Sequence, residues 1–259
     1  FLYSVLFFIL AALATLKGLK TVAWFELFMV LFFSIVVVLV FIFGIPKMDA
    51  ANLVTFFNKE FWFLPYGVLL FAYAGFSAVP IQKEVIGHEN RLLKKSIIWG
   101  SLIPAALYLI FALSIVGIAG ETTSPDVVSG LAGFFDFRVI FLISLFGLLA
   151  ITTSFLALAL ALIETFRLDF KVKRFNSWAL AVLIPFLLFL FGVRNFIEVI
   201  GLAGSVAIGV EGMLLVMMYK KAKRAGDRQP EYSLNFPSWL LNGIAFLFAV
   251  AAIYAVFFV

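Results

Sequence analysis

The chain has 259 residues, of which 65% are hydrophobic and only 13% are charged, and phenylalanine occupies 34 positions. Soluble domains carry about a quarter charged residues, so this composition excludes a water-soluble globular protein and indicates a polytopic membrane protein. There is no cysteine, which excludes disulfides, thiolate metal sites and cysteine nucleophiles, and the single histidine, His88, lies in a charged loop. The net charge of +5 indicates loop charges that set membrane orientation, and it does not point to a nucleic-acid partner.

Eight apolar segments follow one another along the chain. About 20 apolar residues cross the hydrocarbon core of a bilayer, and segments near this length predict eight spans at 1–16, 22–45, 61–81, 96–119, 138–163, 177–193, 195–218 and 237–258. We therefore expect an all-α, polytopic membrane fold in one transmembrane domain over residues 1–259. The chain begins at Phe1, inside an apolar run, and we expect it to lack its amino-terminal part.

Lysine and arginine are distributed unevenly between the connectors of these spans. They concentrate in the first, third, fifth and seventh connectors, which places those connectors in the cytoplasm by the positive-inside rule. Both ends of the chain are then predicted to face the outside.

The third span contains the sequence "FAYAGFSAVP", residues 71–80, in which small residues surround Gly75 and a proline follows at Pro80. One interpretation is close helix–helix approach with an ordinary proline kink. The other is a discontinuous helix, unwound near 74–77, in which Pro80 opens the cytoplasmic half and the freed backbone groups line a binding cavity. Both interpretations predict small residues here, so local chemistry does not separate them.

The seventh span carries two acidic residues and a series of glycines. Glu198 lies near the outer end and is interpreted as interfacial, whereas the deeper Glu211 is either a proton site or the partner of a neighbouring helix. The glycines favour close packing or flexing over ligand contact, and they are Gly201, Gly204, Gly209 and Gly212.

Three segments carry a family resemblance. The sequences "FAYAGFSAVPIQKEVIG" and "LKKSIIWGSLIPAALYLIFALSIVGIAG" resemble the sixth and seventh helices of the amino acid/auxin permease group, and "LLAITTSFLALALALIETFRLDF" resembles the eighth. The nearest resemblance is to bacterial aromatic (tryptophan/tyrosine) amino acid permeases of the amino acid-polyamine-organocation superfamily. It implies an inverted-repeat, broken-helix transporter fold, of which this chain holds helices four to eleven and lacks the first three.

The resemblance implies a secondary active transporter of aromatic or other neutral amino acids, working by cation-coupled symport in the cell (plasma or inner) membrane. The partners implied are a small amino acid substrate and membrane lipids, with no nucleic acid, no enzyme activity, no cofactor and an open oligomeric state. Two alternatives from other classes of protein fit the sequence less well. A membrane enzyme would need an Asp, Glu or His cluster that the sequence does not show, and a non-catalytic subunit of an ion-translocating complex would usually carry more mid-span charges.

Two groups of site residues are predicted. The substrate-binding group, which rests on the small-residue run and on the resemblance, is Phe71, Tyr73, Ala74, Gly75, Phe76 and Ser77. The coupling-ion group is Ala150, Thr153, Ser154 and Glu211. The Ala150 carbonyl and the two hydroxyls suit a sodium ion, whereas Glu211 would suit a proton, and the same hydroxyls could instead bond a carbonyl one turn back.

Overall fold

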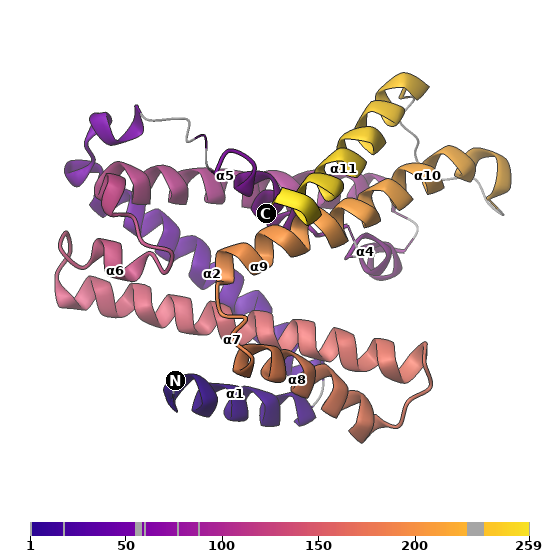
Figure 1. Cartoon of the computed structure of the whole chain (residues 1–259), viewed down its shortest axis with the longest axis horizontal. Coiled ribbons are helices and arrows are strands. Elements are labelled where there is room, and N and C mark those ends of the chain that lie inside the picture. The colour runs from indigo at the N-terminus through magenta and orange to yellow at the C-terminus, as the bar shows by residue number, and fades with distance from the viewer. Residues whose placement is uncertain are drawn as a thin grey trace. The chain divides into compact units, whose positions relative to one another are not determined.

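The computed structural model describes residues 2–17, 19–54, 59, 61–76, 78–87, 89–226 and 236–258. Within these residues all regular structure is helical, which confirms the all-α expectation. The α-helices, labelled in Figure 1 where there is room, are α1 Leu2–Ala14, α2 Leu19–Gly44, α3 Leu64–Ala72, α4 Ala78–Ile86, α5 Asn90–Ala119, α6 Val128–Leu131, α7 Phe137–Leu168, α8 Arg174–Leu190, α9 Phe196–Ala203, α10 Gly209–Ala225 and α11 Ser238–Phe258. Short 3₁₀ turns occupy Thr15–Lys17, Ile45–Lys47, Ala50–Leu53 and Gly120–Thr122, and a π-helical turn, Gly204–Ile208, joins α9 to α10.

Five helical stretches of the described chain are long and apolar enough to cross a membrane, namely Leu27–Lys47, Arg91–Thr122, Phe137–Leu168, Phe196–Ala222 and Ser238–Phe257. Two further apolar helices, Leu2–Ala14 and Arg174–Leu190, are shorter. Many of the large apolar side chains on these helices are exposed, as expected where lipid rather than water surrounds them. The third predicted span is divided between α3 and α4, and the count of eight crossings stays a prediction.

The chain divides into two compact units, each built from two separate segments. Unit 1 contains Phe1–Thr55 and Ala106–Val193, and unit 2 contains Phe56–Ala105 and Arg194–Val259. The long helix α5 contributes its first half to unit 2 and its second half to unit 1. The expectation of one transmembrane domain over residues 1–259 is not decided by this division.

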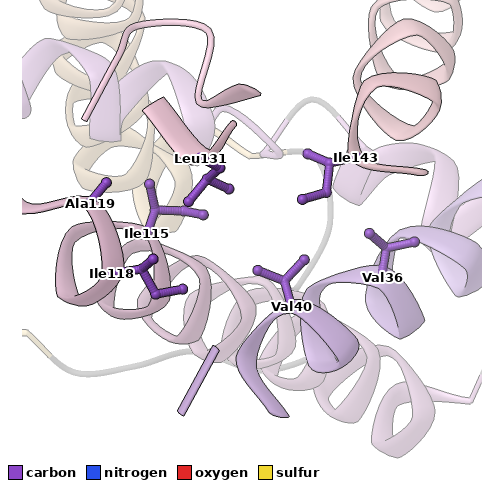
Figure 2. Close-up of a cluster of buried hydrophobic side chains, with 7 residues drawn as sticks. All are labelled: Val36, Val40, Ile115, Ile118, Ala119, Leu131 and Ile143. Carbon is purple, nitrogen blue, oxygen red and sulfur yellow. The ribbon is translucent and has the colours of Figure 1, made fainter. Parts of the chain in front are cut away.

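The core of unit 1 lies where α2, α5, α6 and α7 meet. Figure 2 shows the buried side chains of this cluster, which are Val36, Val40, Ile115, Ile118, Ala119, Leu131 and Ile143. Leu131 of the short helix α6 is fully buried, so this helix closes the cluster. Because lipid is as apolar as these side chains, close van der Waals packing, and not removal from water, is what stabilises the contact between the membrane helices.

The connector that follows α2 is fastened to the end of α5. The Asp49 amide donates to the Gly117 carbonyl at 2.9 Å, and the Asn52 side-chain amide donates to the same oxygen at 3.0 Å. Lys47 donates to the Phe134 carbonyl, which ties the connector to the segment after α6. These bonds satisfy backbone groups that the helix ends leave unpaired.

Unit 2 is held together by a crossing of glycines. Helix α3 packs against α9 and the π-helical turn, and at the crossing a Cβ atom added to Gly67 would collide with the Gly201 carbonyl. A Cβ added to Gly204 would collide with the Gly67 carbonyl. Only glycine lets the two backbones approach this closely, so the close packing predicted for the glycines of the seventh span is confirmed.

The crossing predicts that Gly204→Ala destabilises unit 2. The added methyl group would have to push the π-helical turn away from α3, and overpacking of this kind costs roughly 1–3 kcal/mol. The measurement is the midpoint temperature of thermal unfolding of the detergent-solubilised full-length protein. This midpoint should fall in the variant. The matched control is Gly243→Ala in α11, because a Cβ at Gly243 would meet no atom of the described residues within 4 Å. Equal midpoints for the two variants would contradict the packing described.

Candidate functional site

The break in the third predicted span is the central feature of the candidate site. Helix α3 ends at Ala72, and α4 begins at Ala78. Between them the Gly75 amide donates to the Tyr73 carbonyl at 2.6 Å, two residues back instead of four. The unwinding predicted near 74–77 is therefore confirmed over its described part, and the interpretation as a continuous kinked helix is wrong.

Pro80 weakens a continuous helix at the break, although a proline alone does not end a helix in this chain, since Pro104 and Pro185 lie inside α5 and α8. A continuous helix would need a Pro80 amide to bond the Phe76 carbonyl, but proline has no N–H and its ring would clash with that carbonyl. The Phe76 carbonyl instead accepts from the Val79 amide at 3.1 Å. Pro80 itself lies in the first turn of α4, where the missing donor costs nothing, as predicted.

The predicted substrate residues extend from the last turn of α3 into the break. Among the described members, Phe71, Tyr73 and Gly75 are exposed, and Ala74 and Phe76 are half-buried. Ser77 lies outside the described residues. Among the described residues, a Cβ atom added to Gly75 would have only the Tyr73 carbonyl as a neighbour within 4 Å, so this part of the structure leaves space beside Gly75. A small ligand could therefore approach the backbone at this point.

A π-helical turn lies against the end of α3 that carries the break. A Cβ added to Gly204, the first residue of this turn, would be 3.0 Å from the Phe71 amide. Ser205, the next residue, is buried. Single π-helical turns occur frequently at functional sites. The turn was not predicted, and the glycines Gly204 and Gly209 that bracket it are the only signal for it in the sequence.

A group of aromatic side chains was also missed from the sequence. Phe63 lies against Tyr66 with ring centroids 5.3 Å apart and against Tyr254 at 4.6 Å, and Trp62 meets Tyr254 at 5.4 Å. The Tyr66 hydroxyl is buried and has no hydrogen-bond partner among the described residues. Aromatic residues make up 18% of the chain, so the presence of a tyrosine at position 66 does not by itself indicate a special role. The buried hydroxyl could therefore be found only from the structure.

The predicted sodium ligands lie on α7, in unit 1. The Thr153 hydroxyl donates to the Ala150 carbonyl at 3.0 Å, and Thr153 is 7% exposed. Ser154 is exposed, because adjacent helix residues point about 100° apart. The structure therefore joins Ala150 and Thr153 through the hydrogen bond to a carbonyl one turn back that was the alternative prediction, whereas Ser154, the next residue, is exposed. Whether these oxygens hold a sodium ion stays a prediction.

The two acidic residues of the seventh span differ in position. Glu198 lies in the first turn of α9, where the Asn195 side chain accepts a hydrogen bond from the Glu198 amide at 3.5 Å. A carboxylate is favoured at such a helix start. Glu211 follows the π-helical turn, in the first turn of α10, and is exposed. Whether it carries a proton in transport stays a prediction.

Comparison with known proteins gives two matches. The sequence matches the Tryptophan/tyrosine permease family over residues 1–256. It is 26% identical over 206 residues to a protein described as glutamine transporter 2 of Aliivibrio fischeri, an alignment that covers 74% of this chain and 53% of that protein. The chain thus spans about half the length of this curated relative. No solved structure matches it.

Proposed function

Because the chain belongs to the tryptophan/tyrosine permease family, we propose that it is part of a secondary active transporter that carries amino acids across a membrane. Its apolar helices and its family make it a membrane protein, and a permease family indicates a transporter rather than an enzyme. The observation that carries the proposal is the break between α3 and α4. Unwound backbone within a membrane segment is tolerated where it lines a cavity, which is what a solute site at mid-membrane requires.

The chemistry of the break suits a zwitterion. The carbonyl end of α3 carries a partial negative charge that would attract an ammonium group, and the amino end of α4 carries a partial positive charge that would attract a carboxylate. The Ala78 and Val79 amides already bond carbonyls of the break, so the dipole of α4, more than free donors, would supply this attraction. Phe71, Tyr73 and Phe76 would form the walls that receive the side chain of the substrate.

The substrate class proposed is neutral amino acids. The family description names tryptophan and tyrosine, and the similar protein of Aliivibrio fischeri is described as a glutamine transporter. The described residues hold no group of three or more Asp, Glu or His side chains that could form a metal centre.

The arrangement proposed for the membrane is eight crossings in the cell membrane, corresponding to helices four to eleven of two inverted five-helix repeats. It is supported by the five long helices, the two shorter apolar helices and the broken α3–α4 pair. Transport would be coupled to a cation. We propose sodium at Ala150, Thr153 and Ser154, with a proton at Glu211 as the rival.

Transport activity is tested with the full-length protein in membrane vesicles, using labelled tryptophan, tyrosine and glutamine. Gly75→Leu should reduce uptake to the level of empty vesicles without loss of expression, because the side chain would fill the open space beside the break. The control is Gly75→Ala, whose single methyl group would meet no atom of the described residues closer than 4.0 Å. Normal uptake by Gly75→Leu would mean that the substrate site lies elsewhere, and no uptake of any of the three by the parent protein would contradict the proposed function.

Coupling is tested by uptake across a sodium series at fixed pH. Thr153→Val and Ser154→Ala should each raise the sodium concentration for half-maximal uptake by roughly tenfold, since a hydrogen-bonding group on an ion contributes about 1.5–3 kcal/mol. Thr152→Val is the matched control, because the Thr152 hydroxyl makes the same kind of bond one turn back, to Leu148 at 2.7 Å. Uptake that ignores sodium, follows a proton gradient and is lost in Glu211→Gln would move coupling to Glu211.

A further inference from the structure

A cavity of about 410 Å³ lies in unit 1, away from every residue assigned above. It is lined by residues of α7 and α8 and of the 3₁₀ turn that follows α1. Three of its lining residues are polar, namely Thr15, Glu164 and Arg174, and aromatic walls are supplied by Phe175 and Trp178. It combines a guanidinium with a mainly apolar surface.

The frame of this cavity is fixed by hydrogen bonds between distant parts of the chain. The Trp178 indole N–H lies within hydrogen-bond distance of the Ala12 carbonyl at 3.1 Å and of the Thr15 hydroxyl oxygen at 3.0 Å. The Thr15 hydroxyl donates to the same carbonyl at 2.7 Å, and Thr15 is 3% exposed. Arg174 donates to the Leu16 carbonyl at 3.3 Å. The cavity is therefore preformed by bonds that join the end of α1 to the start of α8.

The charge around the cavity favours an anion. Glu164 is already paired with Arg167 at 3.0 Å, so its negative charge is offset. Arg174 has five N–H donors, and the Leu16 carbonyl is the acceptor found for it among the described residues. Lys171 and Lys173 lie within the three residues that precede Arg174 in the chain. A guanidinium with donors to spare beside further cations is suited to bidentate binding of a phosphate.

The surroundings indicate a lipid rather than a soluble anion. The connector that contains Arg174 is one of those that the distribution of Lys and Arg predicts to be cytoplasmic, at the surface where anionic lipids attract basic segments. Phe175 is 70% exposed and Leu16 is also exposed, so the rim of the cavity is apolar. An acyl chain could lie on this rim, whereas a soluble anion would gain nothing from it.

We propose that this cavity binds an anionic phospholipid, with the phosphate at Arg174 and an acyl chain against Phe175, Trp178 and Ile163. The lipid would bridge the end of α1 and the start of α8 and stabilise that corner of unit 1. None of its residues belongs to the proposed substrate or ion groups, so lipid binding here can be measured separately from transport.

The test is native mass spectrometry of the detergent-solubilised full-length protein titrated with phosphatidylglycerol, phosphatidylethanolamine or phosphatidylcholine. The parent protein should retain phosphatidylglycerol more tightly than the other two, and Arg174→Gln should weaken that retention about five- to tenfold, the effect of one basic group near a lipid phosphate. Arg174→Lys, which keeps the charge but loses the planar fork, should recover part of it. Arg138→Gln, which removes a cation from the opposite end of α7, should retain phosphatidylglycerol like the parent.

Four outcomes would overturn the proposal. The first is equal retention of all three lipids. The second is a loss of phosphatidylglycerol retention in Arg138→Gln as large as that in Arg174→Gln, which would indicate binding by general surface charge. The third is tight phosphatidylethanolamine binding lost in Glu164→Gln, which would indicate a zwitterionic headgroup. The fourth is thermal stabilisation by inorganic phosphate equal to that by phosphatidylglycerol, which would indicate a soluble anion.

Discussion

The fold depends on one constraint, which is that a bilayer core offers no water to bond a peptide N–H or C=O. The long helices answer it by bonding each backbone group within the helix, and their exposed surfaces can therefore be apolar. The same constraint bears on the break between α3 and α4, because in the arrangement proposed above the unwound backbone would lie within the membrane and would have to be surrounded by protein or by water. In the proposed transporter, a water-filled solute pathway would be that environment.

The glycine crossing gives the break a fixed position in unit 2. Gly67, one turn before the end of α3, lies directly on the backbone of Gly201 and Gly204, and the π-helical turn reaches the Phe71 amide. The half of the broken helix that precedes the site is thus held against a neighbouring helix by backbone contact instead of by flexible side chains. This packing makes the carbonyl end of α3 a fixed feature of the candidate site.

The glycine packing could be predicted from the sequence, because glycines in a membrane helix mark close approach. The break could be predicted only with the family resemblance, because the small residues around Gly75 and the proline at Pro80 fit a kinked helix as well as an unwound one. The π-helical turn and the buried Tyr66 hydroxyl could not be predicted, because each depends on what packs against it. The Thr153 hydroxyl could either bind an ion or donate to a carbonyl one turn back, and the sequence did not separate the two. The structure shows the hydrogen bond to the Ala150 carbonyl. The count of eight crossings stays a prediction, because α1 and α8 are shorter than a bilayer is thick.

We propose that the break lines a water-filled substrate cavity, and cysteine accessibility tests this directly, because these 259 residues contain no cysteine and any cysteine elsewhere in the full-length protein would first be replaced by serine. Single-cysteine variants of the full-length protein in vesicles would be treated with a water-soluble electrophilic thiol reagent, with which the thiolate form of cysteine reacts as the nucleophile. Gly75→Cys should react quickly and be protected by a transported amino acid. Leu69→Cys, at a position that is 54% exposed but helical and apolar, should react slowly because lipid prevents ionisation. Equal reactivity at the two positions, or reactivity at position 75 that substrate does not change, would contradict the account.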